Sequence, residues 1–135
     1  MTEAGFEIFE TNGIRLRVAL AGNVGPLVVL VHGFPESWYS WRHQIPALAA
    51  AGYRVAAPDV RGYGGSDKPQ PVEAYAIKEM CADIAGLVTA LGETLAEARR
   101  AAYEAVGKIQ FQGAFYRRDI GEETSEPRPS GSGGK

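Results

Sequence analysis

The residues best suited to chemistry form a short loop, His32-Gly33-Phe34-Pro35, that follows an apolar run from Leu27 to Val31. The run has no polar face, which is typical of a strand covered by helices on both sides. In open α/β sheets, ligands bind beyond the carboxyl ends of the strands. We therefore expect the chemistry of this chain to lie at the loop.

A second loop, Asp59-Val60-Arg61-Gly62-Tyr63-Gly64-Gly65-Ser66, follows the next predicted strand, Tyr53 to Pro58. We interpret Asp59 and Arg61 as a structural pair, with packing favoured over catalysis. Ser66 does not lie in the G-x-S-x-G pattern of a nucleophilic serine, and no base is available to activate it. The second loop is therefore predicted to be structural.

Both loops resemble segments of a known family. The first loop, continued by ESWYSWR at residues 36–42, is similar to the oxyanion-hole region of the α/β-hydrolase superfamily and closely resembles the soluble epoxide hydrolases. The second loop resembles the D-x-R-G-x-G-x-S turn of the same superfamily. The resemblance covers about residues 5–92. It implies a partial α/β-hydrolase fold, an α/β architecture with a mostly parallel sheet and flanking helices in three layers.

The resemblance also assigns roles to residues of the first loop. The backbone N–H of Phe34 would be one donor of the oxyanion hole, with Gly33 allowing the chain to turn and Pro35 fixing its exit. Trp38 would line the substrate cavity. His32 is expected to form a hydrogen bond within the loop and not to act as a base. The implied substrate is a small-molecule epoxide or an ester-like compound, and neither a cofactor nor a metal is expected.

An enzyme of this family also needs a carboxylate nucleophile on a sharp turn, a second acid and a late histidine that activates water. No histidine follows His43, which falls in a predicted helix and is assigned no chemical role. Asp119 follows a predicted strand, but the residue two positions before it is not the glycine of a nucleophile elbow. The chain is a hydrolase by resemblance, and with this incomplete catalytic set we expect it to be inactive alone.

Several predicted elements must position the two loops. Asn12-Gly13, between alternating runs at 6–9 and 14–19, predicts a hairpin. Ser40 or a neighbouring residue is expected to cap a helix that contains Trp41 and ends at Gly52. A second helix is predicted from Tyr75 to Leu91, ending at Gly92. Its predicted apolar face consists of Ile77, Met80, Ile84, Leu87, Val88 and Leu91.

The sequence after Gly92 departs from the hydrolase pattern. It predicts a helix from Thr94 to Val106, with Thr94 and Glu97 as a capping box, and then a strand at 109–116. Residues 88–121 resemble the carboxyl-terminal end of glycinamide ribonucleotide synthetase, without the ATP-binding core of that ligase. We interpret the chain as a chimera with one α/β domain over 1–121, hydrolase-like to residue 92 with an appended helix and strand at 93–121. Residues 122–135 are expected to be a disordered tail or linker.

Composition narrows the possible classes of protein. The 135 residues include 16 acidic and 14 basic side chains, so neither a nucleic-acid nor a membrane partner is expected. A single cysteine, Cys81, cannot form a disulfide framework, and this favours a cytoplasmic location. Cys81 is predicted to face the core. Two alternatives to an inactive hydrolase half stay open. One is a non-catalytic chimeric folded domain, and the other is a binding or oligomerisation module. A binding module would keep the pocket without chemistry, whereas self-association would use an exposed sheet edge.

Overall fold

The computed structural model describes residues 4–92, 96–97, 99–100, 103–104 and 112–113. Its centre is a four-stranded sheet with strand order β1-β2-β4-β3. The strands are β1 (Gly5–Thr11), β2 (Ile14–Ala21), β3 (Leu27–Val29) and β4 (Arg54–Pro58).

The predicted amino-terminal hairpin is confirmed. β1 and β2 pair antiparallel, with Thr11 opposite Ile14 at the closed end. The two residues between them, Asn12 and Gly13, have φ values of 48° and 74°. This left-handed conformation at both positions matches the right-handed twist of the strands, and asparagine and glycine adopt it most easily.

The sheet is mixed. β3 and β4 pair parallel, as expected for a strand–helix–strand unit, whereas β2 pairs antiparallel with β4. The partial α/β fold is thus confirmed, but the described strands form one parallel pair instead of a mostly parallel sheet. The reason is the hairpin, because its second strand runs opposite to β4 when it joins the sheet.

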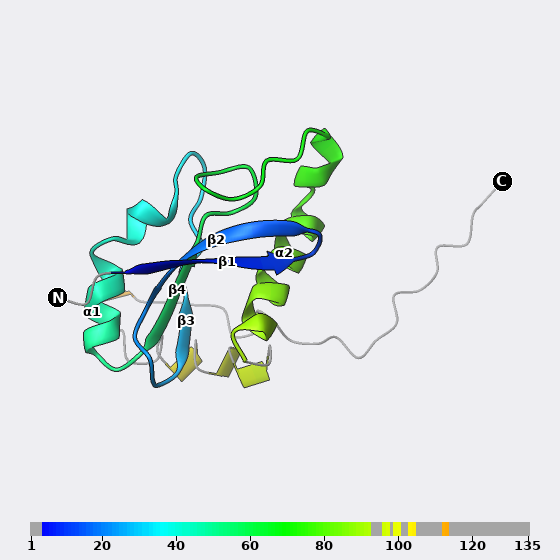
Figure 1. Ribbon diagram of the computed structural model, residues 1–135. Coiled ribbons are helices and arrows are strands. Elements are labelled where there is room, and N and C mark those ends of the chain that lie inside the picture. The colour runs from blue at the N-terminus through cyan, green and yellow to red at the C-terminus, as the bar shows by residue number, and fades with distance from the viewer. Residues whose placement is uncertain (1–3, 93–95, 98, 101–102, 105–111, 114–135) are drawn as a thin grey trace.

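Two α-helices cover the two faces of the sheet, α1 (Gln44–Ala50) and α2 (Ile77–Ala90) (Figure 1). Each is preceded by a single 3₁₀ turn, η1 (Trp38–Trp41) before α1 and η2 (Val72–Tyr75) before α2. The expected three layers are therefore present. None of the helices in the described part of the chain is long and apolar enough to cross a membrane.

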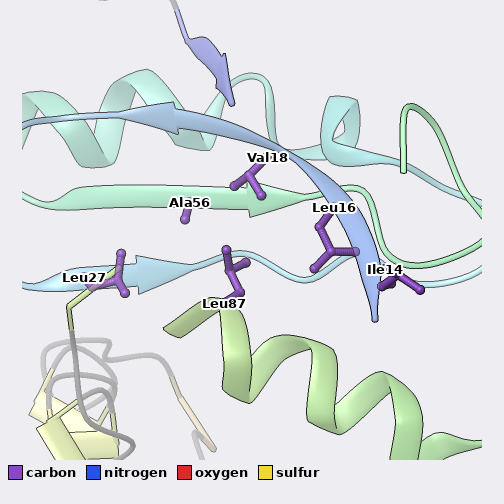
Figure 2. Packing of buried hydrophobic residues seen from close by; sticks show 6 residues of the cluster. All are labelled: Ile14, Leu16, Val18, Leu27, Ala56 and Leu87. Carbon is purple, nitrogen blue, oxygen red and sulfur yellow. The ribbon is translucent and has the colours of Figure 1, made fainter. Parts of the chain in front are cut away.

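Alternation along the strands divides the core into two clusters. Figure 2 shows the cluster under α2, where Leu87 points at the sheet. The buried residues of this cluster are Ile14, Leu16, Val18, Leu27, Ala56 and Leu87. The buried residues of the cluster under α1 are Ala19, Ala21, Ile45, Val55 and Ala57. Neighbouring residues of one strand thus enter opposite cores, because successive side chains of a strand point to opposite faces.

The first predicted helix is interrupted. Its first turn is η1, and the capping side chain is Ser37 instead of Ser40, since the Ser37 hydroxyl accepts a hydrogen bond from the Tyr39 N–H at 3.3 Å. α1 begins only at Gln44. Pro46 explains the interruption, because it has no N–H to donate to the carbonyl four residues earlier.

Two expectations about burial are wrong. Cys81 is exposed instead of facing the core, and Ile77 is 75% exposed instead of lying on an apolar face. The buried residues of α2 are Asp83, Leu87 and Val88, none of which lies among its first six residues. The first turns of α2 therefore carry an apolar pattern without packing against the sheet.

The carboxyl end of α2 is closed by local contacts. The N–H of Leu91 bonds the Leu87 carbonyl, and Gly92, with a φ of 80°, donates to Thr89. The Arg54 guanidinium bonds the carbonyl of Leu91 at 3.1 Å and that of Gly25 at 3.2 Å. The helix end is thus tied to the start of β4 and to the turn before β3, and Gly92 ends the helix as predicted.

Most of the sequence after Gly92 lies outside the described residues. Within the predicted helix from Thr94 to Val106, residues 96–97, 99–100 and 103–104 have helical backbone. Of the predicted strand at 109–116, only residues 112 and 113 are described, and they form a turn. The predicted tail at 122–135 and Asp119 lie outside the described part.

Close packing of α2 against the hairpin gives a first prediction. A Cβ at Gly86 would lie 1.8 Å from the Thr11 hydroxyl oxygen. Gly86→Ala is therefore expected to lower the free energy of unfolding by about 1–3 kcal/mol, although alanine is the better helix former. Urea denaturation measures the change. Thr11→Ala in the same chain removes the clashing hydroxyl and should recover part of the loss, whereas a Gly86→Ala chain more stable than the parent would contradict this packing.

Candidate functional site

The first loop forms a tight turn immediately after β3. The Glu36 N–H donates to the Gly33 carbonyl at 3.1 Å, which closes the turn. The Phe34–Pro35 peptide bond is cis. Pro35 therefore occupies the third position of the turn, and its ring sets the direction in which the chain leaves toward η1.

His32 is buried and both of its ring nitrogens are bound. The Val60 N–H donates to Nε2 at 3.0 Å, and Nδ1 lies 2.8 Å from the Gly33 carbonyl oxygen. A backbone N–H can only donate, so Nε2 must be the unprotonated nitrogen and Nδ1 must carry the proton. His32 is thus a neutral ring with one tautomer that fits its partners, and it has no nitrogen left for acid–base work.

These contacts fix the direction of the Phe34 N–H. The Gly33 carbonyl accepts two hydrogen bonds, one from His32 and one from Glu36. A trans peptide unit is planar with its C=O and N–H pointing in opposite directions, so anchoring the oxygen aims the Phe34 N–H away from the turn. Within the described residues this N–H has no hydrogen-bond partner, and the Phe34 side chain is 85% exposed. The loop therefore presents one oriented backbone donor, suited to an oxygen that acquires negative charge.

Trp38 lies one turn further along. Its indole makes edge contacts with Phe6 at 4.8 Å and with Tyr39 at 5.7 Å between ring centroids. The described cavities of 440 and 420 Å³ lie beside the hairpin turn and near the start of β4, away from the loop. The role of Trp38 as a cavity wall stays a prediction.

Asp59 connects the second loop to the rest of the site. Its carboxylate is fully buried. It accepts the backbone N–H groups of Trp38 at 3.0 Å and Gly65 at 2.9 Å, and it pairs with the Arg17 guanidinium at 2.7 Å. Burial alone would raise the pKa of Asp59, but the hydrogen bonds from Gly65 and Trp38 and the contact with Arg17 outweigh it and hold the pKa below its ordinary value.

Asp59 and Arg61 do not form the predicted pair with each other. Arg61 is buried and binds both carboxylate oxygens of Asp83 at 2.6 Å. This partner holds the guanidinium charged, and the pKa of Arg61 is raised. Asp59 takes Arg17 instead. The expected structural roles therefore fit, but each side chain joins the second loop to a different element, β2 for Asp59 and α2 for Arg61.

Ser66 and His43 are the other candidate side chains that the structure describes. The Ser66 hydroxyl donates to the Asp59 carbonyl at 2.6 Å and accepts the Arg17 N–H at 2.9 Å, so it holds the second loop against β2. His43 is exposed just before α1. Among the described residues no group of three or more histidine, cysteine, aspartate or glutamate side chains could hold a metal ion.

Sequence reasoning found the first loop but missed its neighbours. Tyr63 makes edge contacts with both His32 and Phe34, with ring centroids 5.5 and 6.4 Å apart. Arg17, on β2, was also missed as the partner of Asp59. No signal in the sequence selects Arg17, because only the structure shows that its strand lies beside β4.

Two family models match the chain. One, described as alpha/beta hydrolase fold, matches residues 26–95. The other, described as Phosphoribosylglycinamide synthetase, C domain, matches residues 86–123. The two matched ranges overlap around the end of α2.

Curated relatives share the first part of the chain. Epoxide hydrolase A of Mycobacterium tuberculosis is 60% identical over 86 residues, which are 63% of this chain and 27% of that protein. The AB hydrolase superfamily protein YfhM of Bacillus subtilis is 56% identical over 84 residues, 62% of this chain and 29% of that protein. The chain thus spans less than a third of the length of these relatives.

Solved structures agree with the sequence matches. Epoxide Hydrolase A from Mycobacterium thermoresistibile superimposes with a TM-score of 0.65 at 50% identity, covering 73% of this chain and 34% of that one. Epoxide hydrolase VrEH1 from Vigna radiata gives a TM-score of 0.65 at 49% identity, covering 67% of this chain and 28% of that one.

The buried Asp59 carboxylate gives a prediction about pH. Because its pKa is lower in the folded than in the unfolded chain, the stability that it contributes is present above the ordinary aspartate pKa of about 4 and is lost as the pH falls through the folded value. At pH 7, Asp59→Asn should cost about 3 kcal/mol, the lower end for breaking a buried ion pair, since Arg17 keeps some access to water.

Denaturant titrations from pH 7 down to acid measure both effects. The Asp59→Asn chain should lose less stability on acidification than the parent chain. Asp67→Asn is the matched control, because Asp67 pairs with Arg15 in a largely exposed contact. An Asp59→Asn chain that loses stability with acid as steeply as the parent would contradict the assignment.

Proposed function

Because the chain belongs to the α/β-hydrolase fold family, we propose that it is the amino-terminal part of an epoxide hydrolase-like catalytic domain and supplies one donor of the oxyanion hole. The observation that carries this proposal is the anchored Gly33 carbonyl, which leaves the Phe34 N–H oriented and without a partner among the described residues. The relatives named as epoxide hydrolases support it, since they share this part of the chain.

The donor acts where negative charge develops on oxygen. In the scheme that the resemblance implies, a carboxylate opens the epoxide to a covalent ester, and a histidine-activated water then hydrolyses the ester. The tetrahedral intermediate of that second step carries an oxyanion, which the Phe34 N–H would bind. A preoriented backbone donor needs no reorganisation during the reaction, and removing one such donor typically costs about 10²–10³ in rate.

The chain alone is proposed to have no turnover. Both ring nitrogens of His32 are occupied, and His43 is exposed before α1. No later histidine exists in the sequence. A nucleophile and a base must therefore come from a complementing part, and the substrate is a small-molecule epoxide. With one cysteine and no disulfide framework, we place the protein in the cytoplasm.

Complementation tests the proposal. The purified chain is mixed with the remaining residues of Epoxide hydrolase A of Mycobacterium tuberculosis, those beyond the shared segment, and hydrolysis of a chromogenic aryl epoxide is followed. We expect turnover from the mixture and none from either part. Turnover by the chain alone, abolished by Asp119→Asn, would show instead that residues beyond Gly92 supply a nucleophile.

Two variants of Phe34 isolate the donor in the active mixture. Phe34→Pro removes the backbone N–H, whereas Phe34→Leu keeps it and changes only the side chain. Phe34→Pro should lower kcat about 10²–10³-fold, with Phe34→Leu close to the parent chain. Equal losses in the two variants would mean that the side chain matters and the N–H does not.

Residues 93–121 give a second proposal about the same chain. We propose that the match to the synthetase C domain marks a chimera, in which the appended segment completes the hydrolase domain and covers the edge of the sheet at β3. β3 has one neighbour, β4, among the described strands, and Val31 beyond it is 43% exposed. An uncovered strand edge beside exposed apolar residues favours self-association.

Truncation after Gly92 tests the appended segment. If residues 93–121 belong to the domain, the shortened chain should lose its cooperative melting transition and should associate, because the β3 edge is uncovered. Calorimetry follows the transition, and light scattering follows the molar mass. Removal of residues 122–135 alone is the control and should change neither. A shortened chain that melts cooperatively as a monomer would make residues 4–92 self-sufficient.

A further inference from the structure

We propose that Tyr63 is a positioning residue for the oxyanion donor, a role that rests on the function proposed for the Phe34 N–H. Its ring makes edge-to-face contacts with His32 at 5.5 Å and 82°, and with Phe34 at 6.4 Å and 79°. Phe34 carries the donor N–H of the Gly33–Phe34 peptide unit, and His32 binds the carbonyl of the same unit. Tyr63 thus touches both side chains that border the donor, although it is 29 positions beyond Phe34 in sequence.

Tyr63 is itself held firmly by its own loop. Its N–H donates to the Val60 carbonyl, and its carbonyl accepts the Ser66 N–H, each at 3.0 Å. The Gly62 N–H donates to the Asp67 carbonyl at 2.8 Å. Because the backbone is hydrogen-bonded at Gly62 and at Tyr63, the Tyr63 ring has a stable position against its neighbours.

Val60 links the ring of Tyr63 to that of His32. The Val60 carbonyl receives the Tyr63 N–H, and the Val60 N–H binds Nε2 of His32 at 3.0 Å. His32 is therefore held at Nε2 by Val60, at Nδ1 by Gly33 and on its ring by Tyr63. Three contacts in different directions determine the orientation of a planar ring.

The orientation of the His32 ring affects the Phe34 N–H through one hydrogen bond. His32 Nδ1–H binds the Gly33 carbonyl, and the planar peptide transmits that orientation to the Phe34 N–H. Loss of the Tyr63 ring removes one of the three contacts that hold the His32 ring and opens space beside it. Its hydrogen bonds to Val60 and Gly33 should then weaken together, and the Phe34 N–H should lose its fixed direction.

Nuclear magnetic resonance of the full chain tests this role without any turnover. In the parent chain, the two ring nitrogens of His32 should show the separate ¹⁵N shifts of a single tautomer with the proton on Nδ1. In Tyr63→Leu we expect the two shifts to move toward each other, and the Val60 amide to exchange with solvent about tenfold faster, as for the loss of one hydrogen bond. Tyr63→Phe keeps the ring and should match the parent chain.

Tyr39→Leu is the control for a general loss of aromatic packing, because Tyr39 contacts Trp38 and not His32. Tyr63→Met, which keeps apolar volume without a ring, should repeat the Tyr63→Leu result. The proposal is overturned if Tyr63→Leu leaves the His32 shifts and the Val60 amide unchanged, or if Tyr39→Leu moves them equally. It is also overturned if both ring-less variants fail to melt cooperatively, since Tyr63 would then serve folding. Failure of complementation leaves these readouts intact, so the two proposals fail separately.

Discussion

The carboxylate of Asp59 lies at the junction of three segments that are distant in sequence. It stands at the end of β4, receives N–H groups from Trp38 and Gly65, and pairs with Arg17 on β2. A buried charge of this kind is tolerated only when donors replace the water that it loses. The 3₁₀ turn η1, the second loop and the hairpin are therefore held together by the same desolvated group, which accepts these hydrogen bonds in its ionised form.

In this site the described polar side chains have structural roles, and the group available to a ligand belongs to the backbone. Side chains that look reactive in the sequence, namely Asp59, Arg61, Ser66 and His32, are all engaged in contacts that hold loops in place. In the first loop, the group without a partner among the described residues is the main-chain N–H of Phe34. The direction of a backbone N–H is set by the contacts of its peptide unit and not by its own side chain. Neighbouring groups must therefore hold the peptide unit, as His32 and Glu36 hold the Gly33 carbonyl.

Structural features that depend on a few adjacent residues could be predicted from the sequence. Asn12-Gly13 specified the hairpin, Gly92 the helix end, and the apolar runs two strands beside the loops. The interruption before α1 could also be derived from Pro46, although the expected cap was Ser40 or a neighbouring residue and the capping side chain is Ser37. These features depend on a few adjacent residues, and the sequence contains them all.

Long-range partners could not be predicted in the same way. The pairs Arg17–Asp59 and Arg61–Asp83 join residues 42 and 22 positions apart, and nothing in the spacing selects these partners over other charges. Ile77 and Cys81 were misplaced because a helical stripe shows which residues share a side of α2, but not how much of that side reaches the sheet. The contact of Tyr63 with His32 depends equally on how two loops meet.

The hydrogen bonds at the carboxyl end of α2 have a consequence for changes in the sequence that follows this helix. The end of α2 is held by three hydrogen bonds within residues 4–92. The N–H groups of Leu91 and Gly92 donate to the carbonyls of Leu87 and Thr89, and the Arg54 guanidinium donates to the Leu91 carbonyl. None of these hydrogen bonds involves a residue beyond Gly92. A change in the sequence that follows Gly92 would therefore leave these three hydrogen bonds at the end of α2 in place.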